Sequence, residues 1–189
     1  MSAAGPRGAG PGGGDRDVLA ARIHAVSHLR GTFKLRSGRI ADEYFDKYRF
    51  ESDPVLLRDI ATALGALVPA GTEGLAGLEL GGVPLVTALS AHTGLPAFFV
   101  RKTAKEYGTE QVCEGGDVHG RRLTIVEDVV TTGWQVVMST GDLRAAGAVV
   151  EDALCVIDRE SGGGDAVAAE GIRLHCLFSM SEVRPAPSA

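Results

Sequence analysis

Cysteine is scarce in this chain of 189 residues, which has only Cys113, Cys155 and Cys176. The three are widely spaced, odd in number and form no CxxC pair, which argues against a zinc site or a disulfide framework and favours a reducing cytoplasm. No apolar run approaches the roughly 18 to 20 residues of a membrane span, and the first residues lack the apolar core of a secretion signal. We therefore expect a cytoplasmic protein without a membrane partner.

An excess of positive charge is also absent, since the formal net charge is −5. Bulk electrostatics thus gives no reason to expect a nucleic-acid partner. With 44% hydrophobic and 23% charged residues, the composition is that of a soluble globular protein of ordinary domain size. Residues 1–16 are rich in Gly, Pro and Ala and predict a disordered tail, so we expect a single domain over residues 17–189.

The stretch LTIVEDVVTTG, residues 123–133, organises the rest of the chain. An apolar run carrying two carboxylates, followed by Thr-Thr-Gly and a helical segment from Trp134 to Ala146, predicts a buried strand, a short loop and a helix. Loop amides, threonine hydroxyls and the positive end of the helix dipole suit a phosphate monoester. The carboxylates of Glu127 and Asp128 suit the hydroxyls of a ribose ring or help to hold Mg²⁺. Together these features indicate a ribose 5-phosphate.

The remaining apolar segments predict an α/β fold with a mainly parallel sheet, because strands and helices alternate along the chain. Helices are expected over residues 17–30, 54–68, 85–91 and 165–171, and strands over residues 75–80, 96–100, 148–157 and 172–178. Asp53-Pro54 is a helix-start signal. Ligands of such folds lie beyond the carboxyl ends of the strands. Gly81-Gly82, Arg101-Lys102, the residues 128–133 and Arg159 all follow expected strands, so we expect them to converge on one site.

Two further segments leave alternatives open. Residues 31–46 predict a β-hairpin whose basic residues Lys34, Arg36 and Arg39 lie beside aromatics, as a planar anionic ligand requires, although an ordinary solvated hairpin has the same pattern. Residues 101–120 predict a long loop that concentrates positive charge, either as a closing lid for a pyrophosphate leaving group or as a solvated basic loop. Cys113 falls in this loop, where we expect it to be exposed.

Three motifs resemble one enzyme family. IVEDVVTTG (residues 125–133) resembles the phosphoribosyl-pyrophosphate (PRPP) signature of type I phosphoribosyltransferases. FVRKTAKEYGT (residues 99–109) and LRSGRIADEYFD (residues 35–46) resemble orotate phosphoribosyltransferases in particular. The motifs occur in the family's order, and the resemblance covers essentially residues 17–183.

The resemblance implies the type I phosphoribosyltransferase fold, with an N-terminal hairpin as hood and a flexible lid loop. It also implies a homodimer whose lid reaches the partner's site, and Mg²⁺-dependent transfer of ribose 5-phosphate from PRPP to orotate. The residues that it assigns to catalysis are Lys105, Arg101, Lys102 and Asp128. It assigns PRPP binding to Leu80, Gly81, Gly82, Arg101, Lys102, Lys105, Tyr107, Glu127, Asp128, Val129, Val130, Thr131, Thr132, Gly133, Trp134 and Gln135. It assigns orotate binding to Arg36, Tyr44, Phe45, Thr131 and Arg159. It also implies that Mg²⁺ is held mainly by PRPP, with Glu127 and Asp128 nearby.

Four positions depart from the family pattern. Gly81 and Arg36 stand where many members have lysine, so that one cationic contact is missing at the first and altered in geometry at the second. Tyr107 replaces a common lid histidine, and Trp134 stands where a small residue is usual. Three alternatives therefore stay open: a phosphoribosyltransferase with another heteroaromatic acceptor, a PRPP- or nucleotide-sensing regulator without the chemistry, and a flavodoxin-like nucleotide binder.

Overall fold

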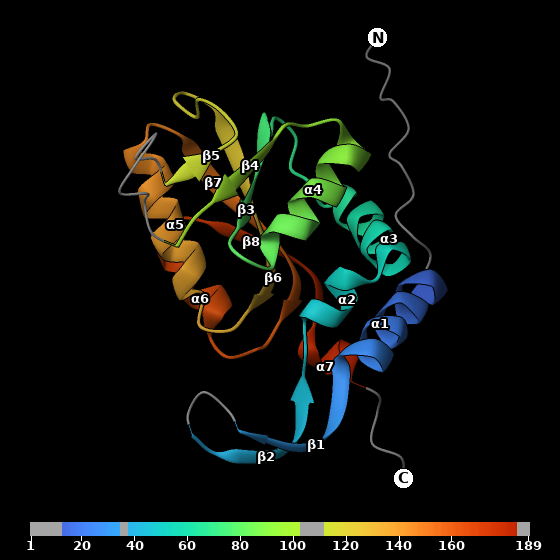
Figure 1. The fold of residues 1–189 in the computed structure, drawn as a ribbon. Coiled ribbons are helices and arrows are strands. Elements are labelled where there is room, and N and C mark those ends of the chain that lie inside the picture. Colours follow the sequence, from blue (N-terminus) through green and yellow to red (C-terminus); the bar gives the residue numbers. More distant parts are fainter. Residues whose placement is uncertain (1–12, 35–37, 103–111, 185–189) are drawn as a thin grey trace.

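A computed structural model describes residues 13–34, 38–102 and 112–184. Its centre is a six-stranded sheet in the order β5-β4-β3-β6-β7-β8 (Figure 1). All neighbouring pairs are parallel except β4 and β5. The strands are β3 (Gly74–Leu78), β4 (Ala97–Val100), β5 (Cys113–Glu114), β6 (Arg122–Val130), β7 (Val149–Asp158) and β8 (Arg173–Ser179). The predicted α/β fold with a mainly parallel sheet is confirmed.

Helices cover both faces of this sheet, which explains why its central strands are mostly apolar. One face packs against α1 (Gly13–Ser27), α2 (Tyr48–Ser52), α3 (Pro54–Gly65), α4 (Gly82–Thr93) and α7 (Met180–Val183). The other face packs against α5 (Trp134–Ala145) and α6 (Gly163–Ala169). Each face has its own apolar cluster, so that the sheet separates two cores.

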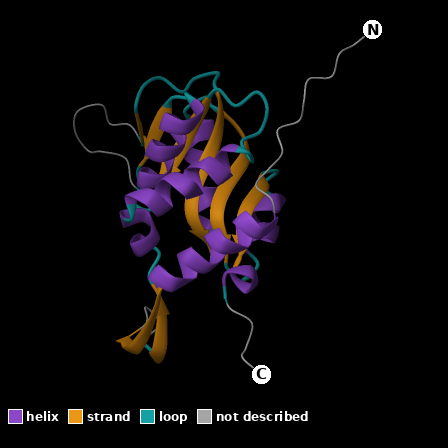
Figure 2. Ribbon diagram, turned by 90° about the vertical axis from the view of Figure 1, so that its right-hand side faces the viewer, coloured by secondary structure: helices purple, strands orange, loops and turns teal. Residues whose placement is uncertain are grey.

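The predicted hairpin is present as β1 (His28–Lys34) and β2 (Ile40–Phe45), an antiparallel pair separate from the main sheet. It projects from the end of the molecule towards which the parallel strands run (Figure 2). The chain turns directly from β2 into α2. The hairpin is therefore tethered beside the carboxyl ends of the strands, where ligands of such sheets bind.

Helix α3 begins as predicted, because the Asp53 carboxylate accepts hydrogen bonds from the amides of Val55 and Leu56. Its end differs, since the helix stops at Gly65 and not near residue 68. Helix α1 begins at Gly13, so residues 13–16, assigned to the tail by composition, are helical. Arg16 holds this first turn in place by a 2.8 Å hydrogen bond to the Leu177 carbonyl and a 2.7 Å ion pair with Glu182.

Three short elements were not predicted: α2, β5 and α7. They have too few residues for a periodic signal, and neighbouring elements stabilise them. Strand β5 buries Cys113, which corrects the expectation that this thiol is exposed. Within the described residues, no helix is long and apolar enough to cross a membrane.

Candidate functional site

The loop after β6 and the start of α5 form a hollow at the carboxyl end of the sheet. Gly133 has a left-handed backbone (φ +74°) and is the N-cap of α5, but no side chain caps the first turn. The first amides of a helix have no partner inside the helix, so they and the dipole attract an anion. The hollow has a volume of about 470 Å³ and is lined by Glu127, Val129, Val130, Thr131, Thr132, Gly133, Trp134, Gln135 and Val136.

The two threonines predicted to bind phosphate are exposed at the mouth of this hollow. Trp134 is also there, with 66% of its surface exposed, so the indole does not pack along the helix. Gln135 turns back along α5, donating a 3.2 Å hydrogen bond to the Ser139 hydroxyl. The structure thus brings the residues 129–135, singled out from the sequence, to one concave surface.

Glu127 and Asp128 lie on opposite faces of β6, because successive side chains alternate along a strand. Glu127 lines the hollow on the α5 side. Asp128 is fully buried on the α2 side, where its two oxygens contact the ammonium of Lys47 at 2.6 and 2.9 Å. The Glu127 carboxyl nevertheless turns back and accepts a 3.0 Å hydrogen bond from the Asp128 amide, so the two carboxyls stay close to each other.

Four side chains form what we call the buried carboxyl cluster: Lys47, Glu51, Glu127 and Asp128. Burial, reinforced by the hydrogen bond with Asp128 and by its charge, raises the pKa of Glu51 to about 9. Burial also raises the pKa of Glu127 well above its ordinary value. Burial alone would raise the pKa of Asp128 too, but hydrogen bonds from Glu127 and Glu51 and the nearby ammonium lower it.

These shifts favour an ion pair between Lys47 and Asp128 and the protonated forms of the Glu51 and Glu127 carboxyls. Among the described residues, Oε1 of Glu51 is buried without a hydrogen-bond donor, and the contact of Oδ2 of Asp128 with the Lys47 ammonium is an ion pair without hydrogen-bond geometry. A carboxyl proton retained by Glu51 satisfies this facing pair of oxygens. The cluster is therefore electrically neutral, as burial requires.

Sequence reasoning missed Lys47 and Glu51. They lie four residues apart where the chain enters α2, so the same side of one helical turn carries both. The sequence contained that spacing, but the segment between the hairpin and Asp53 was too short to suggest a helix. Together with Asp128, this pair adds a cation to the site that the motifs did not show.

Gly81 contacts the same cluster. A Cβ at this position would lie 1.6 Å from Oδ2 of Asp128 and 2.8 Å from Oε1 of Glu51, so no side chain fits. The sequence indicated that a cationic contact is missing at Gly81. The structure places the ammonium of Lys47 2.6 Å from this same oxygen, Oδ2 of Asp128.

The carboxyl ends of β3 and β4 complete this edge of the site. The peptide bond between Glu79 and Leu80 is cis, and the Leu80 side chain is exposed. The Glu79 carboxylate accepts a 3.2 Å hydrogen bond from the Lys102 amide, which joins the two strand ends. The guanidinium of Arg101 lies 3.3 Å from the Glu114 carboxylate.

Arg159 follows β7 and is exposed, and its amide donates a 2.8 Å hydrogen bond to the Val130 carbonyl. The ends of β3, β4, β6 and β7 thus lie at the same edge of the sheet, and their convergence on one ligand site stays a prediction. In the hairpin, Tyr44 is exposed beside Phe33, whereas Phe45 points the other way and packs against the core. The two aromatics assigned to orotate thus do not share a face. Arg36, Lys105 and Tyr107 lie outside the described residues.

Comparison with known proteins identifies the family of this chain. No protein-family model matches the chain. An orotate phosphoribosyltransferase of Nocardioides sp. is 52% identical over 172 residues, which cover 91% of this chain and 96% of that protein. The chain belongs to the orotate phosphoribosyltransferase family. A second orotate phosphoribosyltransferase, from Methanocella arvoryzae, is 42% identical over 81% of this chain and 87% of its own length.

Solved structures of orotate phosphoribosyltransferases agree with the fold. The Mycobacterium tuberculosis enzyme in complex with inorganic phosphate has a TM-score of 0.82 at 30% identity, covering 90% of this chain and 99% of that one. The same enzyme in complex with PRPP has a TM-score of 0.78 at 29% identity, covering 89% and 98% of the two chains. The Mycobacterium tuberculosis enzyme has thus been solved with inorganic phosphate and with PRPP.

Proposed function

We propose that this chain transfers the ribose 5-phosphate unit from PRPP to orotate, giving orotidine 5′-monophosphate and pyrophosphate for pyrimidine biosynthesis. The observation that carries the proposal is the uncapped start of α5, which faces a concave surface beside a buried acidic cluster in a member of this family. The free amides at the helix start suit the phosphate end of ribose 5-phosphate. The carboxyl oxygens suit the hydroxyls of its sugar ring.

The described residues have the following roles in binding PRPP. Amides of the first turn of α5 and the hydroxyls of Thr131 and Thr132 hold the 5-phosphate. Glu127 accepts a hydrogen bond from one ribose hydroxyl. Asp128 is the charged acceptor for the other ribose hydroxyl, and its ion pair with Lys47 holds it in position. The ammonium of Lys47, close to Gly81, adds positive charge beside the loop assigned to pyrophosphate. Departure of pyrophosphate leaves an oxocarbenium-like ribose, so charge neutralisation and exclusion of water both lower the barrier.

Mg²⁺ fits this arrangement only as a companion of the substrate. Among the described residues no group of three metal-ligating side chains occurs, and Asp128 is already paired. Mg²⁺ is commonly bound by substrate phosphates with one or two carboxylates, and Glu127 at the hollow would be one of these after releasing the proton that its burial favours. When bound with PRPP, the metal supplies positive charge to the leaving group. We further propose a cytoplasmic homodimer in which the lid serves the partner's site.

The direct test is a steady-state assay with PRPP, Mg²⁺ and orotate, following the loss of orotate absorbance, with uracil and nicotinate as parallel acceptors. Consumption of orotate alone supports the proposal. If PRPP binds by calorimetry while no orotate is consumed, the acceptor is different or the chain is a sensor. Turnover with uracil or nicotinate in place of orotate identifies the altered-acceptor alternative.

Lys105→Ala is expected to lower kcat by at least about 100-fold while PRPP still binds, because a lid cation contacts the leaving group mainly in the transition state. Single-turnover kinetics and PRPP titration calorimetry separate the two effects. Arg58→Ala, which removes an exposed cation of α3 to which no ligand is assigned, is the control and is expected to keep kcat. Unchanged turnover in Lys105→Ala would remove the lid lysine from the mechanism.

Trp134 provides a second test, because it is the single tryptophan of the chain and lines the hollow. PRPP is expected to change its fluorescence on binding. Trp134→Asn should change the free energy of unfolding by no more than about 0.5 kcal/mol, since the indole is exposed. Met138→Asn, one turn further along α5 and also exposed, is the control, and its tryptophan emission should respond to PRPP as in the unmodified chain. PRPP binding without any change in emission would place the bound phosphate away from this helix start.

A further inference from the structure

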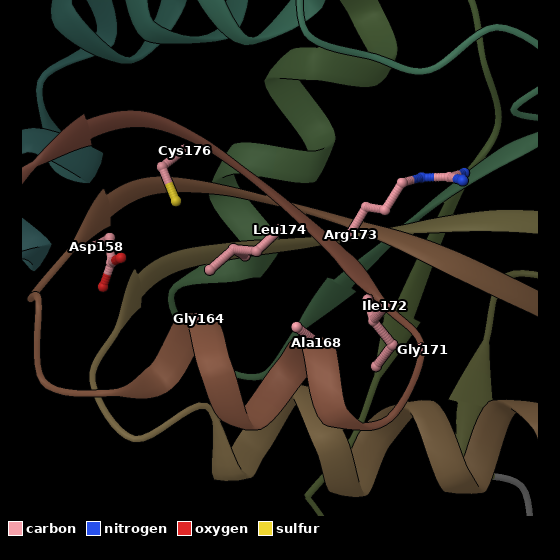
Figure 3. A pocket seen from close by; sticks show the side chains of 8 residues that line it. All are labelled: Asp158, Gly164, Ala168, Gly171, Ile172, Arg173, Leu174 and Cys176. Carbon is pink, nitrogen blue, oxygen red and sulfur yellow. The ribbon is translucent and has the colours of Figure 1, made fainter.

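A second hollow lies between α6 and the edge strand β8, away from the buried carboxyl cluster. Its volume is about 540 Å³, and it is lined by Asp158, Gly164, Ala168, Gly171, Ile172, Arg173, Leu174 and Cys176. The Cys176 sulfur points from β8 towards the side on which α6 lies (Figure 3). A reagent that enters this hollow therefore meets a thiol.

Cys176 has a second thiol as its neighbour. Cys155 on β7 is paired in register with Cys176 on β8, and the Cys155 thiol donates a 3.2 Å hydrogen bond to the Cys176 sulfur. Neighbouring strands lie about 4.8 Å apart. This separation falls within the Cα–Cα range of about 4.4–6.8 Å that a disulfide spans, so the sulfurs can approach to about 2.05 Å by small side-chain rotations.

The two thiols differ in access and in acidity. Cys155 is fully buried in the core between the sheet and α5, whereas Cys176 is partly exposed. The hydrogen bond from Cys155 lowers the pKa of the Cys176 thiol. The same bond, together with burial, raises the pKa of Cys155. Cys176 is thus the attacking thiol and Cys155 the resolving one.

We propose that Cys155 and Cys176 form a dithiol modification site that a hydroperoxide entering the hollow converts to a disulfide. The Cys176 thiolate attacks one peroxide oxygen, the O–O bond breaks, and a sulfenic acid and hydroxide form. Cys155 then attacks the sulfenic sulfur, the S–S bond forms, and the S–O bond breaks. The hydroxide leaves as water with the thiol proton. In sum, two thiols and one hydrogen peroxide give one disulfide and two waters.

Cys113 is an internal control for the test. It is buried on β5, burial raises its pKa to about 11, and it lies away from the pair. The folded full-length protein is exposed to dilute hydrogen peroxide, remaining thiols are alkylated, and peptides are mapped by mass spectrometry. We expect one linked peptide joining Cys155 and Cys176, while Cys113 is oxidised at least about tenfold more slowly.

Single variants separate the two roles. Cys176→Ser is expected to leave Cys155 reduced under the same treatment. Cys155→Ser, or Cys155→Ala if serine destabilises the core, is expected to accumulate a sulfenic acid at Cys176 that dimedone traps. Oxidation of Cys113 at the same rate as Cys176, or a sulfenic acid at Cys176 that never links to Cys155 in the unmodified chain, would overturn the proposal. The readout is covalent mass, so it is independent of the proposed enzymatic activity.

Discussion

Lys47→Met is expected to destabilise the fold by about 3 kcal/mol and to raise the KM for PRPP at least about tenfold. The substitution leaves the fully buried Asp128 without its cation, and removing one partner of a buried ion pair typically costs about 3–5 kcal/mol. The lower end applies because the Lys47 side chain is one-third exposed and Glu51 can still share its proton with Asp128. Urea unfolding gives the stability, and steady-state kinetics give KM and kcat separately.

Two variants distinguish the charge from the packing at this position. Lys47→Arg keeps the positive charge and is expected to recover most of the stability. Lys47→Met combined with Asp128→Asn removes the unpaired carboxylate together with its cation, so it is expected to recover most of the stability without restoring the KM for PRPP. If the double variant has the KM of the unmodified chain, Lys47 only stabilises the fold and does not serve the ligand site.

The contrast between Lys47 and the loop of residues 128–133 shows what sequence can predict. The loop is a local structure, in which strand, turn residues and helix start follow one another, and its assignment from sequence agrees with the structure. Lys47 and Asp128 are 81 residues apart, and only packing of α2 against the end of β6 brings them together. No local pattern carries that contact.

The same reasoning explains the hairpin and Cys113. Alternation predicted a hairpin, but it could not show that Phe45 packs against the core while Tyr44 stays exposed, because this depends on where the hairpin attaches. Cys113 stands in a stretch of charges and glycines, and it is buried only because two residues pair with the edge of β4. Two-residue strands have no period to detect.

Gly81 illustrates a case in which the sequence raised a question that only the structure answers. Glycine in place of lysine predicted the loss of a cationic contact. The position of Asp128 shows that any side chain at residue 81 meets a buried carboxylate, and that a cation reaches this carboxylate from α2 instead. Gly81 and Lys47 both contact Asp128, so substitutions at these two positions are expected to have non-additive effects.

Gly133→Ala is the second substitution with a large expected effect. The left-handed backbone at this residue costs an alanine about 1–2 kcal/mol. Its Cβ would also lie 2.7 Å from the Gly163 carbonyl oxygen and 2.9 Å from Cγ2 of Val167, so α6 must move. We expect the free energy of unfolding to fall by about 2–4 kcal/mol, which sums the backbone strain and the overpacking.

The effect on ligand binding follows from the same displacement. Gly133 sets the direction in which the first amides of α5 face the hollow, so their shift should weaken phosphate binding and raise the KM for PRPP more than about tenfold. Gly141→Ala in the same helix is the matched control, because a Cβ there meets no atom within 4 Å and a helical alanine stabilises by about 0.5–1 kcal/mol. A Gly133→Ala protein that loses stability but binds PRPP as tightly as the unmodified chain would show that the phosphate is held by the threonine hydroxyls and not by the start of α5.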